Sequence, residues 1–432
     1  MWAPSDINAL PTAEDVLNVK EAISELKRQI EIARSSPESL VKVDVLQKEL
    51  EERLAWVAPW RRVPTDILSI IFEYCNREDW KSSLMLTAVS TRWRAIVLST
   101  PRAWSYVDTK ECKNYRIVRT YLDRGGQCPL HFYYPSRRSD IPVSKIAQRL
   151  HCLSIENMYI YEMVNSDFPN LECLSLQTGT TTSRLSRITS TRFPSLRHLI
   201  CGSLGSDSDS EWMPPDFPPL TTLSIAVAID LAWLTVLQAS RDTLTSLRLH
   251  LHEQFSIPAE HQVTLPRLQC LEIQNWTTVN SAWPLDLKTP ILQTYVEHHR
   301  RIRDQYLHKD LATIRRMRTN VHTPVPPLPQ LSLLQLEIQD DIPERLVGQL
   351  SDESLYPKLE RVEVFSRTRR PNVRHLVEQM FGVRSSQPPF VVTSKRETEF
   401  PGTISKFTSR EGYRETTCDD RWAVSPEYRF LR

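Results

Sequence analysis

The feature that most constrains this chain is a six-residue pattern, L-x-x-L-x-[L/I], that recurs from residue 150 onward. Copies begin at residues 150, 171, 196, 220, 244, 268, 331 and 359, with a degraded copy, LQTYVE, at 292. Successive first positions are 21, 25, 24, 24, 24, 24, 39 and 28 residues apart. Several copies follow a Phe-Pro or Leu-Pro pair, as in FPSL and LPRL. A single copy means little, but so many at one spacing predict a repeat architecture.

A period near 24 residues lies within the range of leucine-rich repeats. Each copy would contribute a short strand whose fourth and sixth positions point into the core. Stacked copies would then form a solenoid with a parallel sheet on its concave side. We therefore expect a solenoid over residues 108–384, followed by a tail, 385–432, that lacks the repeat. With helical segments before it, the chain belongs to the α+β class.

The third, fifth and seventh positions of each copy should face the concave surface. These positions are mixed and polar without a stripe of one charge, which favours recognition of another protein. The candidate target-binding residues are Cys152, Cys173, His198, Arg248, His250, Glu272, Arg361 and Phe365.

Three of these candidates fall at the same repeat position on successive predicted strands. Neighbouring strands lie about 4.8 Å apart, so Cys152, Cys173 and His198 could line up on one face. Soft ligands of this kind could hold zinc, but a ladder of small residues explains the same pattern, and we favour the ladder. The chain has no CxxC pair, no GxSxG or HExxH motif, and no phosphate-binding loop. We therefore expect neither a metal or other cofactor nor an enzyme.

The 39-residue gap contains an insertion at about 298–327 in which Arg alternates with Ile302, Tyr306, Leu311 and Ile314. This spacing predicts an amphipathic helix over 298–318, followed by a Pro-rich linker. The basic helix could contact nucleic acid or an acidic partner, or act as a nuclear address. A solvated helix is the interpretation we favour, so nucleic acid is an unlikely partner.

The first 58 residues carry two apolar seams at helical spacing, separated by Ser-Ser-Pro at 35–37. One seam contains Ile23, Leu26, Ile30 and Ala33, and the other contains Val43, Leu46, Leu50 and Val57. Because the seams do not share one heptad register, we expect two short helices folded back as a hairpin. A continuous dimeric coiled coil is the alternative.

Residues 59–107 should form three helices, near 64–75, 79–89 and 91–98, with Pro64 opening the first and Ser90 available as a cap. The first helix has two apolar stripes. One contains Ile67, Ile71 and Tyr74, and the other contains Leu68, Phe72 and Cys75. A module of about 45 residues cannot bury so many apolar groups by itself. One stripe should face a partner, although the N-terminal helices or the first repeat could also cover it.

These residues resemble an F-box in Val63-Pro64, Ile67-Leu68, Ile71-Phe72, Val89, Trp93-Arg94, Pro101 and Trp104. Val63 stands where the family usually has Leu, and Ser90 stands where Cys commonly follows the Val. The order of coil, F-box and repeats resembles the F-box proteins with leucine-rich repeats that are abundant in mushroom-forming fungi. The resemblance implies a substrate receptor of an SCF-type cullin-RING ubiquitin ligase, which binds a Skp-family adaptor and, through it, a cullin. The adaptor contacts implied by position are Pro64, Ile67, Leu68, Ile71, Val89 and Trp93.

The bulk composition is that of an ordinary soluble protein, with 25% charged residues and a net charge of +2. The first residues lack the basic and apolar regions of a secretion signal, and the apolar run at 223–237 carries Asp230. We therefore expect a cytoplasmic or nuclear protein without a membrane partner. An interaction scaffold that binds no adaptor, and a nucleic-acid-associated protein using 298–318, are the alternative functions.

Overall fold

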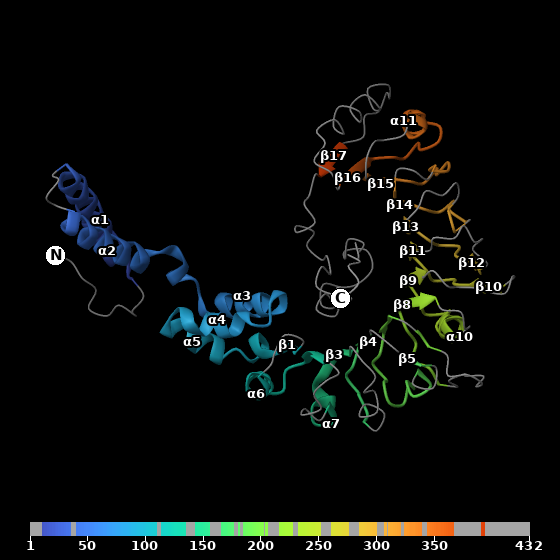
Figure 1. Cartoon of the computed structure of the whole chain (residues 1–432), viewed down its shortest axis with the longest axis horizontal. Helices are drawn as coiled ribbons and strands as arrows, with labels where there is room; N and C mark the ends of the chain where they lie inside the picture. The colour runs from blue at the N-terminus through green and yellow to red at the C-terminus, as the bar shows by residue number, and fades with distance from the viewer. Residues whose placement is uncertain are drawn as a thin grey trace. The chain divides into compact units, whose positions relative to one another are not determined.

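The computed structural model describes most of the chain in segments (Figure 1). The described residues are 11–35, 40–109, 114–134, 143–155, 166–176, 180–181, 185–202, 204–205, 216–227, 232–251, 261–275, 285–299, 306–308, 310–320, 324–338, 344–366 and 390–393. The chain divides into two compact units. The first contains Met1–Val107 and Arg116–Cys128, and the second contains Asp108–Tyr115 and Pro129–Arg432.

The first unit begins with two helices, α1 (Ala13–Arg34) and α2 (Leu40–Val57), which pack side by side (Figure 1). A capping box starts α1, in which the Thr12 hydroxyl accepts from the Asp15 N–H and the Asp15 carboxylate accepts from the Thr12 N–H. Both predicted seams meet in one cluster made of Val19, Ile23, Leu26, Ile30, Ala33, Leu46, Leu50 and Trp56. Helix α1 therefore pairs with α2 of its own chain, as a hairpin does, rather than continuing as one long coiled coil.

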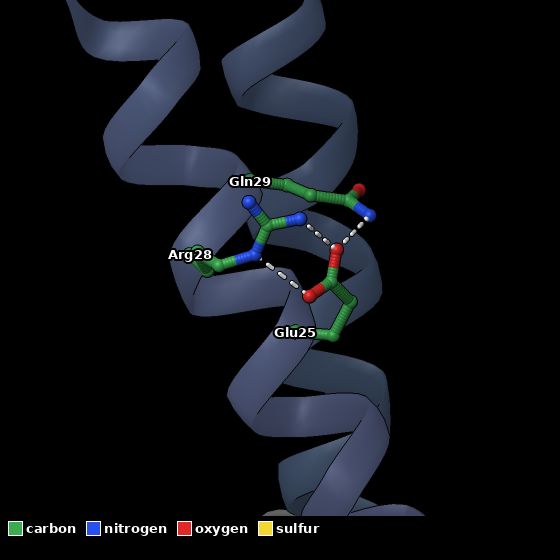
Figure 2. A network of polar contacts seen from close by, with 3 residues as sticks. All are labelled: Glu25, Arg28 and Gln29. Atoms are coloured by element: carbon green, nitrogen blue, oxygen red, sulfur yellow. Dashed lines mark hydrogen bonds and ion pairs between the residues drawn. The ribbon is translucent and has the colours of Figure 1, made fainter.

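A polar network on α1, drawn in Figure 2, joins Glu25, Arg28 and Gln29. The Glu25 carboxylate accepts hydrogen bonds from Nε and Nη2 of Arg28, at 2.8 and 2.7 Å, and from Nε2 of Gln29 at 2.8 Å. Hydrogen bonds from Arg28 and Gln29 lower the pKa of Glu25 to about 2. Because these side chains are exposed, the network keeps this face of the hairpin solvated and adds little to stability.

The rest of the first unit is a compact group of short helices. They are η2 (Pro59–Arg62), α3 (Thr65–Glu78), α4 (Ser82–Val89), α5 (Thr91–Leu98), η3 (Pro101–Trp104) and most of α6 (Tyr115–Arg124). Strand β1 (Tyr106–Asp108) follows η3 and begins a thirteen-stranded sheet. The solenoid predicted over residues 108–384 includes 115–124, but Tyr121 packs on Trp80 and Trp104 of the helical unit.

The second unit is built on the parallel part of this sheet. Its strands follow chain order: β2 (Leu130–Tyr134), β3 (Leu150–Ile155), β4 (Cys173–Leu176), β6 (His198–Cys201), β8 (Thr222–Val227), β9 (Ser246–Leu251), β11 (Cys270–Asn275), β13 (Thr294–His299), β14 (Arg316–Asn320), β15 (Leu333–Ile338), β16 (Arg361–Ser366) and β17 (Phe390–Thr393). Every neighbouring pair from β2 to β17 is parallel.

Smaller elements lie between these strands. Two additional parallel ladders pair β5 (Thr180–Thr181) with β7 (Leu204–Gly205) and β10 (His261–Thr264) with β12 (Leu285–Lys288). The described helical segments of this unit are α7 (Val143–Ile146), η4 (Ala147–Arg149), α10 (Ala232–Ala239) and α11 (Glu344–Ser351). Helices and a large parallel sheet together agree with the expected α+β class.

The repeat pattern sets the register of the sheet. The fourth positions of successive copies are paired across neighbouring strands and form one buried column. This column contains Leu153, Leu174, Leu199, Leu223, Leu247, Leu271, Tyr295, Met317, Leu334 and Val362. A one-residue slip would turn this column away from the core, so the apolar period specifies the pairing.

The predicted helix at 298–318 is wrong for the residues that the structure describes. β13 extends to His299, residues 306–308 and 310–315 contain no helix, and β14 begins at Arg316. Ile314 and Met317 take the first and fourth positions of a further repeat copy, IRRMRT, which lies 22 residues after the copy at 292. The 39-residue gap between the copies at 292 and 331 therefore contains a degenerate copy of the repeat. Residues 300–305, 309 and 321–323 lie outside the described residues, as does most of the tail apart from β17.

Candidate protein-binding surfaces

Helix α3 begins immediately after Pro64, whose carbonyl accepts the first helical hydrogen bond, from Leu68 N–H at 3.0 Å. Asp66 in the first turn and Arg77 in the last turn have the signs that suit the helix dipole. The inner face of α3 is formed by Leu68, Phe72 and Asn76, spaced four residues apart and all buried. The helix therefore has its own core on one side.

The opposite side of α3 carries a second apolar stripe, which we call the α3 stripe. Its members are Ile67, Ile70, Ile71 and Tyr74, which are 45%, 51%, 44% and 58% exposed. The spacing of i, i+3, i+4 and i+7 places all four on one face of the helix. Large apolar side chains scattered singly on a surface are ordinary, but a continuous stripe of this kind indicates an interaction site.

Helix α4 adds two further exposed apolar residues, Met85 and Val89, which lie four residues apart and so share one face of α4. Ser90 caps the next helix, as expected, because its hydroxyl accepts from Trp93 N–H at 3.1 Å. The Trp93 ring is half-buried between Phe72, at a centroid distance of 5.0 Å, and Trp60, at 6.1 Å.

Polar contacts hold these helices together. The Arg92 guanidinium donates to the carbonyls of Arg61 and Val63, the second at 2.7 Å. Trp104 Nε1 donates to the Val97 carbonyl at 2.8 Å. The buried Asn76 amide donates to the Trp80 carbonyl, also at 2.8 Å. The polar groups in these contacts therefore have partners within the helical unit.

The six predicted adaptor contacts differ in their exposure to solvent. Pro64, Ile67, Ile71 and Val89 are exposed, and Trp93 is half-buried. Leu68 is only 3% exposed and contributes to the core, so its assignment as a surface contact is wrong. Ile70 and Met85 are also exposed, although the sequence did not single them out. Ile70 could have been found from its spacing of three residues from Ile67.

The predicted target-binding residues lie on the sheet but do not all reach its surface. Cys152, Cys173 and His198 are paired in register on β3, β4 and β6, and His131 on β2 continues the same row. Cys152 and Cys173 are buried, which contradicts their assignment to an accessible face. Among the described residues, no group of three or more His, Cys, Asp or Glu is arranged to hold a metal ion.

His198 is half-buried, and Thr222 on β8 follows it in the same row. Burial lowers the pKa of His198 to about 4, although the nearby Glu172 carboxylate opposes the shift. The imidazole is therefore neutral at physiological pH.

The fifth positions form a row that becomes charged in the middle of the sheet. Arg248 on β9 pairs with Glu272 on β11, with Nη2 and Oε2 2.8 Å apart. Burial would raise the pKa of Glu272, but the charges of Arg248 and His298 and a hydrogen bond from Gln274 lower it to about 2. Glu272 is only 1% exposed, so it is buried and does not lie on an accessible surface as predicted.

The remaining candidates differ in exposure. His250 is half-buried, with Nε2 3.1 Å from the Ser224 hydroxyl. Arg361 is exposed and pairs with Glu363 at 2.6 Å. Phe365 lies in β16, but its side chain is outside the described residues. Among the candidates whose side chains the structure describes, His198, Arg248, His250 and Arg361 are thus at least partly accessible.

No protein-family model matches this chain, and a search of curated proteins also finds no match. Within the described segments, no helix has both the length and the apolar character needed to cross a bilayer.

Proposed function

We propose that this chain is the substrate-recognition subunit of an SCF-type cullin-RING ubiquitin ligase, with residues 59–107 as an F-box that binds a Skp-family adaptor. The observation that carries the proposal is the α3 stripe, which stays exposed on a helix whose opposite face already has a complete core. A preformed apolar helix face of this kind suits a stable protein interface. The F-box resemblance supplies the identity of the partner.

The sheet would be the concave side of a leucine-rich-repeat solenoid that holds a target protein. Its in-register column of fourth-position residues and its strand order support this proposal. Neighbouring copies of a solenoid contact each other and leave a broad surface for a partner. The receptor would contribute proximity, since it holds the target close to the transfer machinery and makes or breaks no bond itself.

The adaptor should bind through the α3 stripe, and this can be tested by co-purification of the full chain with a Skp-family adaptor. Ile67→Asp/Ile71→Asp would place two unpaired carboxylates in the interface. Burying such charges costs several kcal/mol, which corresponds to a loss of affinity of at least about 100-fold.

Two control variants make the result specific. Val45→Asp changes another exposed apolar residue, which lies on α2, and we expect it to leave adaptor binding unchanged. Leu68→Asp should unfold the helical unit, because Leu68 is buried, and circular dichroism would register that loss. If the stripe variant stays folded and still binds the adaptor as the wild type does, the proposed contact is wrong. If the wild type itself binds no adaptor, the chain is an interaction scaffold of another assembly.

The nucleic-acid alternative loses its structural basis, because the basic segment contains a strand where a helix was expected. Arg318 of β14 is buried, although Arg315 and Arg316 are exposed. No described feature of this segment favours nucleic acid over a protein partner.

A further inference from the structure

We propose that Tyr74 and Arg77 form a prearranged anchor at the C-terminal end of the α3 stripe, and that this anchor receives a carboxylate of the adaptor. This inference rests on the proposed function, and it names the chemistry by which one end of the interface would be recognised.

Tyr74 is the most exposed member of the stripe and the only one with a polar group. Tyrosine is common among the residues that dominate binding energies, because its ring covers a large apolar area and its hydroxyl can form a hydrogen bond. Its position at the end of the stripe would place the hydroxyl at the rim of an apolar contact.

Arg77 holds this ring in place from one side. The guanidinium carbon lies 5.8 Å from the centroid of the Tyr74 ring and 5.7 Å from that of Tyr106. Nε of Arg77 also donates to the Tyr106 hydroxyl at 3.1 Å, and Tyr106 is buried. Arg77 is therefore fixed to the core at one end and packed on an exposed ring at the other, so little side-chain freedom is left to lose on binding.

The charge of Arg77 is not neutralised within the described part of the chain, where no carboxylate lies within ion-pair distance of it. A cation in the last turn of α3 suits the helix dipole, but the dipole does not require packing between two tyrosine rings. One of the five guanidinium N–H groups is directed to Tyr106, and others remain for a further acceptor. A carboxylate matches the geometry of these donors, and the Tyr74 hydroxyl lies on the same helix end to assist.

The test compares the affinity of the full chain for the Skp-family adaptor at low and high salt. We expect Arg77→Gln to weaken binding about 10-fold at low salt and to reduce the dependence of affinity on salt, because one ion pair is lost. Tyr74→Ala should weaken binding by a similar factor. The double variant should lose less than the product of the two single effects, because both residues serve one contact.

Arg28→Gln is the matched control, since it removes the same charge from the exposed face of α1 and should change neither affinity nor salt dependence. Thermal unfolding of each variant shows whether the helical unit is intact. If Arg77→Gln and Tyr74→Ala bind like the wild type while Ile67→Asp/Ile71→Asp does not, the anchor is overturned and the adaptor interface stands. If the wild type does not bind the adaptor, both proposals fail together.

Discussion

On β13, the hydroxyl of Tyr295 donates a hydrogen bond to the carboxylate of Glu297, two residues further along the strand. Glu297 occupies the sixth repeat position, where most other copies have an apolar residue, and it is fully buried. Both of its oxygens also lie 3.3 Å from the N–H of Leu307, and the Tyr295 hydroxyl accepts from the N–H of His308 at 3.3 Å. Polar side chains of the degraded copy LQTYVE thus bond to the main chain of residues 307–308.

The Tyr295–Glu297 pair should show strong thermodynamic coupling. Tyr295→Phe and Glu297→Leu each leave buried polar partners unsatisfied, and each should cost about 1–3 kcal/mol of the free energy of unfolding. The double variant should lose less than the sum of the two, which urea denaturation can measure. Amide hydrogen exchange at Leu307 and His308 should become faster in both single variants. Strict additivity would show that the two side chains act independently.

Glu272 should make the sheet sensitive to acid. Its folded-state pKa of about 2 lies below the ordinary value of 4.5, so the stabilisation is complete above pH 4.5 and is lost as the pH falls toward 2. The shift corresponds to about 3 kcal/mol at most. The free energy of unfolding of the wild type should therefore fall more steeply between pH 4.5 and 3 than that of Glu272→Gln. Glu360→Gln, which removes an exposed carboxylate from the same unit, should behave like the wild type.

His198 should make the stability of the fold depend on pH in a higher range than Glu272 does. Burial holds its pKa near 4, below the ordinary 6.5, so its contribution is complete above pH 6.5 and is lost as the pH falls from 6.5 toward 4. An NMR titration of the imidazole should show protonation well below pH 6. His198→Asn should flatten the dependence of stability on pH in this interval. A titration midpoint near 6.5 would mean that the ring is solvated.

Arg92 should stabilise the start of the helical module at residues 59–107. Its guanidinium bonds to two carbonyls that precede α3, so Arg92→Ala should destabilise the helical unit by about 2 kcal/mol. Arg94→Ala is a close control, because Arg94 is exposed and donates to the single carbonyl of Thr87. Thermal denaturation of the two variants should differ clearly. Equal melting temperatures would assign the stability to apolar packing alone.

The spacing of apolar residues was sufficient to predict the strands of the recognised repeat copies and their register, because only one pairing keeps every fourth position inside. It was also sufficient to predict the paired N-terminal helices and the cap at Ser90. It failed at β14, since L-x-x-L spacing is shared by a strand copy and by one turn of an amphipathic helix. Hydrogen bonding of Arg316, Met317 and Arg318 with β13 and β15 decides between the two.

Helical spacing divided α3 into two stripes but could not say which one is buried, because both are equally apolar. The tertiary structure decides this, since Trp93 packs on Phe72 and leaves Ile67 and Ile71 outside. In the same way, the repeat pattern placed Glu272 on a surface, and only the structure shows it buried beside Arg248. The sequence alone determined which residues share a face. What each face meets depends on neighbours that are distant along the chain, and only the folded structure shows them.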